Sequence, residues 1–338
     1  MKVIVTGGTG FVGSHTVSEL VRAGHDVKLL VRDTSRVRPA IEPLGVGEVE
    51  SVIGDVTDKE SVERALEDCD AVIHCASVYS LDPRAAASIR KTNVTGTDLV
   101  IGTAHEMGLD PIVHVSSIVT LIGTKGAVLT PDSAPTTPSG PYNRSKADSE
   151  RVARRYQDNG APVVITYPGS VWGPNDPHLG ESCQIAKAIL RRFWTTVPVG
   201  GVPISDVRDV AKLHAAVLEK GRGARRYIAP AQNASIKSLV NTVSQVTGRW
   251  LPCVPVPGWT LRWPMRAVDA VRLISPIRMP VNFQAVYIGA LNHKSDDSLT
   301  RREFGLAPNP IDQTLADTIR WMYEGNHLSR KLAGLLAA

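Results

Sequence analysis

Short apolar runs alternate along the first part of the chain with segments whose apolar residues recur at helical spacing. KVIVTG (2–7), DVKLLVR (26–32) and VESVIGD (49–55) are apolar runs, and a helical pattern over residues 12–23 separates the first two. Strands and helices that alternate in this way form βαβ units, in which consecutive strands lie parallel. This part of the chain therefore predicts a parallel sheet covered by helices.

The same alternation continues through the middle of the chain. The further elements are a helix opened by the capping box TDKE (57–60), a strand DAVIHCA (70–76), an Ala- and Thr-rich helix over residues 84–107, a strand PIVHVSS (111–117), a helix from Tyr142 and a strand PVVITYPGS (162–170). Ser or Thr followed three residues later by Glu is the signature of a helix start. The predicted fold class is α/β, with the doubly wound parallel sheet of a Rossmann fold.

The alternation weakens after Pro174. Six prolines fall between residues 252 and 280, whereas ISDVRDVAKLHAAVLE (204–219) and RRYIAP (225–230) again read as a helix and a strand. We therefore predict two units. Residues 1–175 form the Rossmann domain, with 204–230 returning to it, and residues 176–203 and 231–338 form a smaller C-terminal lobe for the substrate.

Composition restricts the class of protein. Of the 338 residues, 43% are hydrophobic and 21% are charged, which is typical of a globular chain with a sizeable core. The 38 Lys and Arg residues exceed the 33 Asp and Glu residues by a net charge of +5, and the basic residues are scattered. This distribution does not predict binding to nucleic acid.

The cysteines and the N-terminus indicate the compartment. Cys69, Cys75, Cys183 and Cys253 show neither a CxxC spacing nor a neighbouring histidine cluster, so neither a disulfide framework nor a metal site is predicted. MKVIVTGG (1–8) passes from a short strand directly into glycines, and no run reaches the roughly 18 apolar residues of a spanning helix. We expect a cytoplasmic protein.

A glycine-rich turn follows the first strand. Gly7, Gly10 and Gly13 are spaced three apart, and Gly8, Gly10 and Gly13 fit GxGxxG. Such a turn lets a pyrophosphate approach the backbone at a helix N-terminus, and here it has the required strand before it and helix after it. The residues predicted to contact a dinucleotide in this turn are Gly7, Thr9, Gly10, Phe11, Val12 and Gly13.

The end of the second strand indicates which dinucleotide. NAD-binding folds usually place a carboxylate there for the ribose hydroxyls, whereas this chain has Arg32, followed by Asp33. An arginine accommodates a 2′-phosphate, so NADP is predicted over NAD. Arg36 and Arg38 either add to this charge or belong to a solvated basic loop.

The ends of the third and fourth strands supply further candidates. Asp55 and Val56 suit contacts to the adenine edge and ring, although Asp55 could equally cap the next helix. Cys75, Ala76 and Ser77 are small enough for a cofactor to pass closely, and simple strand termination is the alternative.

Three residues that can carry proton chemistry converge on the same edge of the predicted sheet. Ser117 ends the fifth strand, and Tyr142 and Lys146 lie one turn apart at the start of the following helix. We predict that Tyr142 donates a proton to a carbonyl that receives hydride, and that Ser117 polarises the carbonyl oxygen. Lys146 is expected to bind the nicotinamide ribose and lower the pKa of Tyr142.

These motifs resemble a known superfamily. TGGTGFVGSH, GDVTD, HVSS, YNRSK and PGSVWGP, in this order over about residues 1–230, are similar to the extended branch of the short-chain dehydrogenase/reductases. The resemblance implies that Ser117, Tyr142 and Lys146 are the catalytic triad and that Asn93 supports a proton-relay water. It further implies that Pro168, Gly169, Ser170 and Val171 contact the carboxamide end of the nicotinamide.

Within that branch the chain looks like the dihydroflavonol reductases, 3β-hydroxysteroid dehydrogenases and aldehyde reductases. VPISDVRDVA (202–211) lacks the Arg-Asp-aromatic motif common in sugar-nucleotide epimerases. The predicted reaction is NADP-dependent hydride transfer to or from a ketone, aldehyde or secondary alcohol. A sugar-nucleotide epimerase or dehydratase and a non-catalytic NADP-binding sensor are the alternatives.

The C-terminal lobe predicts the kind of substrate and the partners. Its aromatic and apolar residues suit an apolar small molecule, and we interpret these as pocket or core residues: Trp259, Leu261, Trp263, Met265 and Phe283. A helical pattern between Trp259 and Ile274 predicts a helix over the pocket, with binding to a membrane surface as the less favoured alternative. Arg191 and Arg192 are expected on a solvated face, Tyr79 is a candidate pocket residue, and a homodimer is predicted.

Overall fold

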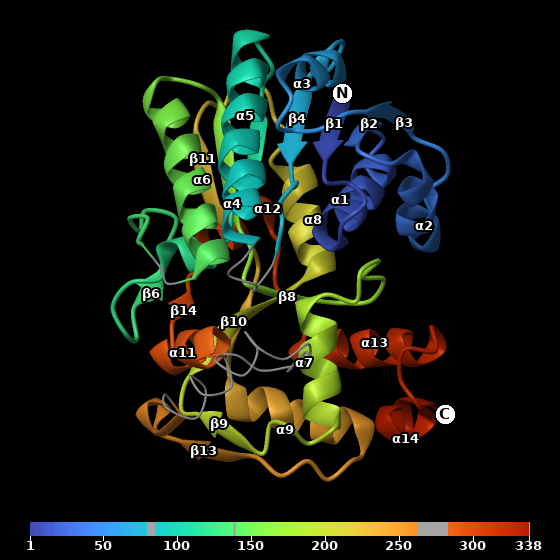
Figure 1. The fold of residues 1–338 in the computed structure, drawn as a ribbon, viewed down its shortest axis with the longest axis vertical. Coiled ribbons are helices and arrows are strands. Elements are labelled where there is room, and N and C mark those ends of the chain that lie inside the picture. The colour runs from blue at the N-terminus through green and yellow to red at the C-terminus, as the bar shows by residue number, and fades with distance from the viewer. Residues whose placement is uncertain (80–84, 138–139, 262–282, 338) are drawn as a thin grey trace.

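The central sheet consists of seven parallel strands in the computed structural model, which describes residues 1–79, 85–137, 140–261 and 283–337. The strands are β1 (Lys2–Thr6), β2 (Asp26–Val31), β3 (Glu50–Ile53), β4 (Ala71–His74), β5 (Ile112–Val115), β7 (Val163–Tyr167) and β11 (Arg225–Ile228). Their order across the sheet is β3-β2-β1-β4-β5-β7-β11, and every pairing is parallel. The predicted Rossmann-type α/β fold is confirmed (Figure 1).

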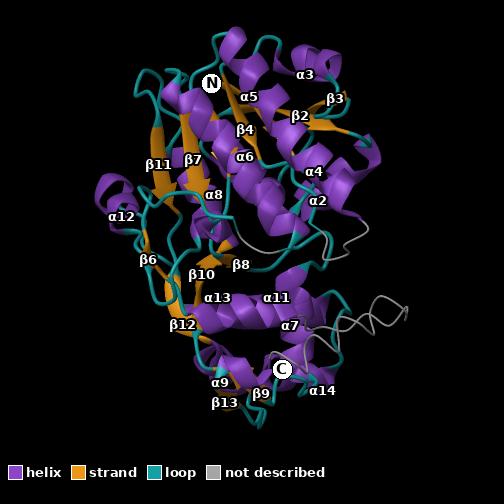
Figure 2. Cartoon of the chain, turned by 60° about the vertical axis from the view of Figure 1, so that its left-hand side comes forward, coloured by secondary structure: helices purple, strands orange, loops and turns teal. Residues whose placement is uncertain are grey.

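Helices cover both faces of this sheet because alternate residues of each strand point to opposite sides. Val3 and Val5 of β1 pack in a core with α1 (Phe11–Arg22), α2 (Val37–Ile41) and α8 (Val207–Ala216). Ile4 belongs to the core on the other face, under α3 (Lys59–Leu66), α5 (Gly96–Glu106) and α6 (Pro141–Asp158). Figure 2 shows α5 and α6 lying over one face.

Short elements complete this part: α4 (Ala86–Arg90), the π-helical turn η4 (Lys91–Thr95) and the 3-10 turns η1 (Thr34–Arg36), η2 (Glu42–Leu44) and η5 (Ile118–Leu121).

The start of α3 differs from the sequence prediction. The N-cap is Asp58, whose carboxylate accepts a hydrogen bond from the backbone N–H of Ser61 at 3.2 Å, rather than Thr57. Thr57 lies outside the helix, where its backbone N–H and its hydroxyl both donate to Asp55, at 2.8 and 2.9 Å. The predicted capping box is therefore wrong by one residue, and Asp55 does not cap the helix.

The chain leaves the sheet after β7 and returns to it through α8 and β11. Arg225–Ile228 pairs with Val164–Tyr167, so RRYIAP contains the predicted strand that returns to the sheet, and this strand lies at its edge. Between β7 and α8 the chain forms part of the smaller lobe. The exact domain boundaries stay a prediction.

The smaller lobe contains short sheets and helices around Trp172, which is fully buried. Its strands are β8 (Ser170–Trp172), β9 (Thr196–Pro198), β10 (Gly201–Asp206), β12 (Gln232–Ser235) and β13 (Val254–Val256), and its helices are α7 (Glu181–Leu190), α9 (Ile236–Thr247), α11 (Phe283–Leu291), α13 (Ile311–Glu324) and α14 (Arg330–Ala333). The remaining elements are β6 (Val128–Leu129), β14 (Lys294–Ser295), α12 (Ser298–Phe304) and the turns η6 (Gly258–Leu261) and η7 (Gly334–Ala337).

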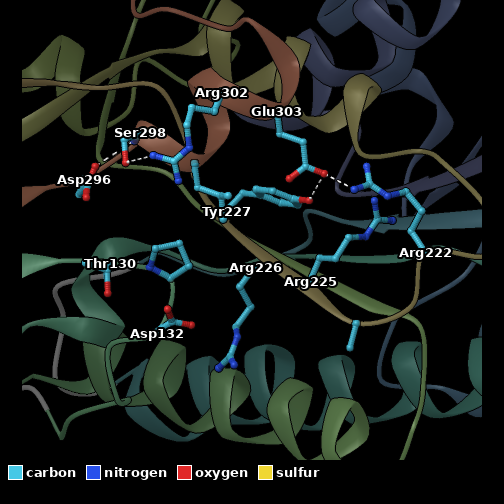
Figure 3. Close-up of a pocket in the computed structure, with 13 residues that line it drawn as sticks. Thr130, Asp132, Arg222, Arg225, Arg226, Tyr227, Asp296, Ser298, Arg302 and Glu303 are labelled. Atoms are coloured by element: carbon cyan, nitrogen blue, oxygen red, sulfur yellow. Dashed lines mark hydrogen bonds and ion pairs between the residues drawn. The ribbon is translucent and has the colours of Figure 1, made fainter.

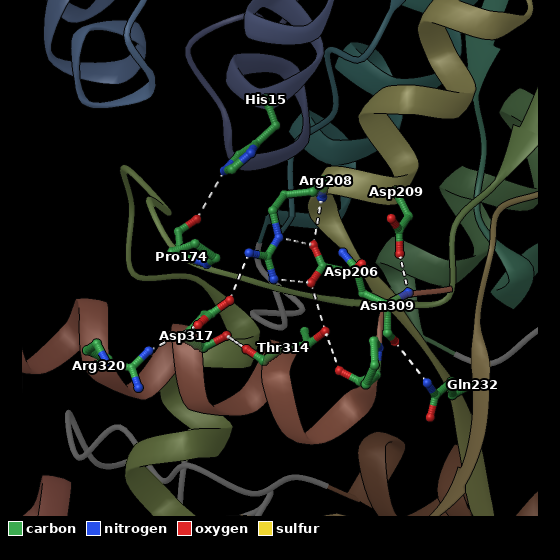
Figure 4. Close-up of polar contacts among 12 residues, drawn as sticks. His15, Pro174, Asp206, Arg208, Asp209, Gln232, Asn309, Thr314, Asp317 and Arg320 are labelled. Carbon is green, nitrogen blue, oxygen red and sulfur yellow. Dashed lines mark hydrogen bonds and ion pairs between the residues drawn. The ribbon is translucent and has the colours of Figure 1, made fainter. Parts of the chain in front are cut away.

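Charged and polar contacts join the two lobes (Figure 4). Arg208, at the start of α8, pairs with Asp206 at 2.6 Å and with Asp317 of α13 at 2.8 Å. His15 of α1 contacts the carbonyl of Pro174, just beyond β8, at 3.0 Å. One of these contacts starts from α1, the helix that follows the glycine-rich turn.

Several predictions about the C-terminal lobe fall outside the described residues. Trp263, Met265 and most of the helix expected between Trp259 and Ile274 lie there, and Phe283 is the first residue of α11. Trp259 itself is 71% exposed, so it is not a core residue. Arg191 and Arg192 are exposed, as expected, with Arg192 lying over the ring of Trp250. Throughout the described ranges, every helix is too short or too polar to cross a bilayer.

Candidate active site

The glycine-rich turn lies at the end of β1 and leads into α1. Gly7 has a φ of +72°, a conformation that L-residues with side chains rarely adopt, and a Cβ placed on it would lie 2.7 Å from the backbone of Ala76. A Cβ on Gly13 would lie 2.1 Å from the carbonyl oxygen of Gly7. The bare backbone beneath the first turn of α1 is the cradle that a pyrophosphate requires.

The same turn brings together other predicted residues. Phe11 begins α1, and a Cβ on Gly173 would lie 3.7 Å from its ring. Ala76 lies directly beside Gly7, with Cys75 before it and the exposed Ser77 after it. Thr9 and Val12, on either side of Gly10 and Phe11, are half-buried. The ends of β1 and β4 therefore meet, as the strand order requires.

Arg32 follows β2 and is exposed. Within the described ranges it forms no ion pair, whereas its basic neighbours do: Arg36 pairs with Asp33 at 3.4 Å and Arg38 with Glu42 at 2.8 Å. Asp33 also accepts hydrogen bonds from the backbone and hydroxyl of Ser35, at 3.0 and 2.6 Å. Arg32 is thus the cation at this position that remains available for a ligand.

Asp55 and Val56 lie beyond β3. The Oδ1 atom of Asp55 is used by Thr57, as described above, and Val56 is 8% exposed and packs against Gly96. Gly96 follows η4, so the predicted adenine residues contact the start of α5. Their role in binding adenine stays a prediction.

Lys146 joins α6 to the end of β5. Its Nζ donates a hydrogen bond to the carbonyl oxygen of Val115 at 2.8 Å, and the residue is only 5% exposed. Val115 lies two residues before Ser117, and α6 packs against the η5 turn that begins after Ser117. The hydroxyl of Ser117 accepts from the backbone N–H of Val119 at 3.4 Å. The structure therefore brings the predicted serine and lysine to the same edge of the sheet.

Tyr142 lies one helical turn before Lys146 and is half-buried. The ring of Tyr79 packs edge-on against it, with ring centroids 4.7 Å apart and planes at 74°. Tyr79 comes from the segment after β4, so this aromatic pair spans the gap between β4 and α6. Tyr79 is thereby brought beside the predicted proton donor.

Burial sets the protonation of both groups. It lowers the pKa of Lys146 from 10.5 to about 8, partly offset by the negative charge of Glu150. It raises the pKa of Tyr142 above its ordinary value of 10, and Glu181 raises this pKa further. The sequence prediction that Lys146 lowers the pKa of Tyr142 is therefore wrong for this arrangement, in which the lysine ammonium is bound by Val115. A phenol with a raised pKa keeps its proton at neutral pH and can give it away.

Asn93 lies in the π-helical turn η4 and is 2% exposed. Its side chain accepts from the backbone N–H of Val78 at 2.7 Å and donates to the Val78 carbonyl and to the hydroxyl of Ser145, at 3.1 and 2.9 Å. Ser145 in turn donates to the backbone carbonyl of Tyr142 at 2.7 Å. Asn93 thus connects the segment that carries Tyr79 to the helix turn that carries Tyr142. A role in a proton relay stays a prediction.

The residues after β7 lie beside the end of β5. The carbonyl of Pro168 accepts from the backbone N–H of Ile118, next to Ser117, at 3.0 Å. A Cβ on Gly169 would lie 2.6 Å from the carbonyl oxygen of Pro203, and Ser170 and Val171 continue into β8. These four predicted residues therefore reach the same edge as Ser117.

The comparisons with known proteins agree with this geometry. The model of the NAD dependent epimerase/dehydratase family matches residues 3–229. The chain belongs to this family. A putative dihydroflavonol 4-reductase of Synechocystis sp. is 31% identical over 328 residues, covering 94% of this chain and 93% of the relative. Sterol demethylase protein B of Methylococcus capsulatus is 29% identical over 339 residues, covering 96% and 99%. The crystal structure of gox2253 superposes with a TM-score of 0.81 at 26% identity, covering 97% of this chain and 99% of that one.

Membership of the epimerase/dehydratase family makes this an NAD(P)-dependent enzyme of the oxidoreductase type, and the predicted resemblance is confirmed. The residues present fit such a dinucleotide, because the turn at Gly7 and Gly13 has no room for side chains. Gly7, Gly10 and Gly13 would hold the pyrophosphate at the start of α1.

A separate pocket of about 630 Å³ lies beside the edge strand β11 (Figure 3). Within it Glu303 accepts a hydrogen bond from Tyr227 at 2.9 Å and forms an ion pair with Arg222. The residues that line this pocket include none of those predicted for the family's active site. It is therefore distinct from the candidate site.

The sequence did not predict some of the residues that hold or influence the candidate active site. His74 connects Thr6 of β1 to Thr97 of α5, at 2.8 and 3.2 Å, and Glu181 influences Tyr142 from the smaller lobe. Ser145 and Ser149 lie four residues apart, on one face of α6, and this spacing could have indicated the polar network. Ser149 donates a hydrogen bond to the carbonyl of Asn93. No local pattern pointed to Glu181, because it lies far along the chain from Tyr142.

Proposed function

We propose that this chain is an NADP-dependent reductase of a ketone or aldehyde in an apolar or aromatic small molecule. The observation that carries the proposal is the bond from Lys146 to Val115, which fixes the Tyr142 helix against the end of β5, two residues before Ser117. The names of the two relatives refer to a flavonoid reduction and to sterol metabolism, which supports an apolar substrate. The Tyr79 and Tyr142 rings supply an aromatic surface for such a molecule.

The roles follow from the chemistry of the side chains. The bound dinucleotide supplies the hydride that the carbonyl carbon accepts. The Tyr142 hydroxyl donates its proton to the carbonyl oxygen, and its raised pKa favours this acid role over the reverse one. The Ser117 hydroxyl donates a hydrogen bond to the same oxygen. Lys146 holds the helix turn in place and would bind the ribose hydroxyls.

The preference for NADP is supported by the end of β2. Asp33 is occupied by Ser35 and Arg36, so its carboxylate is not free to accept ribose hydroxyls. Arg32 is exposed and without an ion pair to any described residue. A charge-assisted bond to a 2′-phosphate suits this arrangement. Titration of the wild type with NADPH and NADH tests the preference directly, and equal affinities would contradict it.

The reaction is tested by following NADPH oxidation with flavonoid ketones, steroid ketones, aromatic aldehydes and sugar nucleotides. Tyr142→Phe removes the transferable proton and keeps the ring. The turnover number for whichever carbonyl compound the wild type reduces should therefore fall roughly 100-fold or more, while NADPH binding is retained. Tyr156→Phe is the matched control, because Tyr156 lies on the same helix and bonds Asp98 away from the site, at 3.2 Å.

Two outcomes would overturn the proposal. Near-normal turnover in Tyr142→Phe would remove the proton donor from the mechanism. Conversion of a nucleotide sugar, with no reduction of any apolar carbonyl, would show that this member of the family is an epimerase or dehydratase.

A further inference from the structure

Glu181 brings a carboxyl group from the smaller lobe to the candidate active site. It is the first residue of α7, and it is hydrogen-bonded to Tyr79. The ring of Tyr79 packs at 4.7 Å on the ring of Tyr142, and the charge of Glu181 acts on the Tyr142 phenol. Three side chains from separate parts of the chain therefore face the same space.

The segment before Glu181 is held in an unusual conformation. Asn175 and Leu179 have φ angles of +59° and +48°, which non-glycine residues seldom adopt. Asp176, only 3% exposed, secures this turn by accepting from the backbone N–H groups of His178 and Gly180, at 3.0 and 2.7 Å. Strained backbone persists where the surrounding structure fixes it, and it is concentrated at functional sites. Here it fixes the point at which α7 begins.

The Glu181 carboxyl retains capacity for a ligand. The residue is exposed, and no ion pair joins it to a lysine or arginine of the described residues. A carboxyl group offers two oxygens with about four acceptor positions, of which the Tyr79 hydroxyl uses one. Although the residue is in contact with solvent, the protein around its carboxyl desolvates it and raises the pKa of Glu181, as expected for a carboxyl that lacks a neighbouring cation. An acid in a first helical turn also stabilises the helix, but this requires no contact with Tyr79.

We propose that Glu181 is a specificity-determining residue, which accepts a hydrogen bond from a substrate hydroxyl group close to the carbonyl that Tyr142 protonates. The inference rests on the proposed reductase function and narrows it to hydroxy ketones or hydroxy aldehydes. A carboxylate at this place also repels phosphate and carboxylate groups, so it disfavours anionic substrates near the reacting carbon.

The test compares ketones that differ by one hydroxyl group. The pairs are a dihydroflavonol with the flavanone that lacks its 3-hydroxyl, and benzoin with deoxybenzoin. Wild type should prefer the hydroxylated member in kcat/KM by roughly tenfold or more, since a site built for a hydroxyl rejects the analogue without it. Glu181→Ala should abolish most of this preference, mainly through a higher KM for the hydroxylated ketone. Glu181→Gln keeps one acceptor oxygen and should retain part of the preference.

The matched control is Glu60→Gln, because Glu60 is also an acid in the first turn of a helix but lies on α3. It should leave the preference unchanged. A merely structural role for Glu181 would lower activity on both members of a pair equally, or lower the melting temperature without changing their ratio. Either result, or a wild type without preference, would overturn the inference.

Binding separates this inference from the proposed reaction. Each ketone is titrated into the NADPH complex of the wild type and of Glu181→Ala, with quenching of tryptophan fluorescence as the signal. If the wild type binds the hydroxylated ketone more tightly and Glu181→Ala does not, the role of Glu181 is supported, even if neither ketone is reduced. Absence of reduction would count only against the reductase function. Equal binding of both members by the wild type counts against Glu181.

Discussion

Lys146 is expected to make the folded protein less stable than a neutral side chain would. Its ammonium is buried, and among the described residues it donates a hydrogen bond only to the neutral carbonyl of Val115. The perturbation that tests this is Lys146→Met, which keeps an unbranched apolar side chain of similar length and removes the charge. The variant should be catalytically impaired yet more resistant to unfolding at neutral pH.

The magnitude follows from the pKa. Folding lowers the pKa of Lys146 from 10.5 to about 8, and each pKa unit is worth roughly 1.4 kcal/mol, so charge burial costs about 3 kcal/mol. Loss of the bond to Val115 offsets about 1 kcal/mol of the gain. Lys146→Met should therefore raise the free energy of unfolding by about 2 kcal/mol at pH 7.

The effect has a defined pH dependence. Below pH 8 Lys146 is charged in both the folded and the unfolded chain, so the wild type bears the full cost. Between pH 8 and 10.5 the folded protein loses this proton first, and the stability of the wild type rises relative to the variant. By about pH 10 the charge cost falls to about 1 kcal/mol, and the advantage of Lys146→Met should have nearly vanished.

The assay is equilibrium urea unfolding at pH 7 and pH 10, followed by circular dichroism and without added cofactor. Lys28→Met is the control, because Lys28 is equally buried but bonds the carbonyl of Glu67 at 3.1 Å and pairs with Glu50 at 3.6 Å. It should lose stability. The reasoning is refuted if Lys146→Met is less stable than the wild type at pH 7, or if its advantage does not change with pH.

Two further predictions concern the dinucleotide. Gly13→Ala would place a methyl group 2.1 Å from the Gly7 carbonyl oxygen, so NADPH affinity, measured by fluorescence titration, should fall at least tenfold. Gly47→Ala is the control, because Gly47 has open space around it, and this variant should bind NADPH normally. Arg32→Asp should lower or invert the ratio of NADPH affinity to NADH affinity. Arg38→Ala, which breaks only the pair with Glu42, should leave that ratio within twofold of the wild-type value. An unchanged ratio in Arg32→Asp would exclude a contact between Arg32 and the 2′-phosphate.

Local signals were sufficient for the sheet and for most of the cofactor turn. The alternation of apolar runs predicted all seven strands, and the spacing of glycines predicted a turn in which Gly7 does adopt a positive φ. The capping signal failed by one residue because Thr57 and Asp58 are both good caps, and in the structure Thr57 bonds Asp55 while Asp58 caps the helix. A choice of that kind depends on tertiary contacts.

The electrostatics of the site were less accessible from sequence. A spacing of four residues correctly placed Tyr142 and Lys146 on one face of α6, but the direction of the Tyr142 pKa shift depends on burial and on Glu181. Both are properties of the assembled lobes. Sequence spacing can name the groups that carry chemistry, whereas their protonation is determined by neighbours that are distant along the chain.

The late position of β11 in the chain constrains how the protein is made. β7 is buried along its whole length, and its outer edge pairs only with β11, which begins at Arg225. During synthesis the ribosome must add the first segment of the smaller lobe and all of α8 before that edge can be covered. A nascent chain therefore leaves one edge of the strand VVITY without a partner, and such an edge is a template for association with other chains. Slow translation or a shortage of chaperones over this interval should favour aggregation, even though the finished protein keeps β7 in the interior of its sheet.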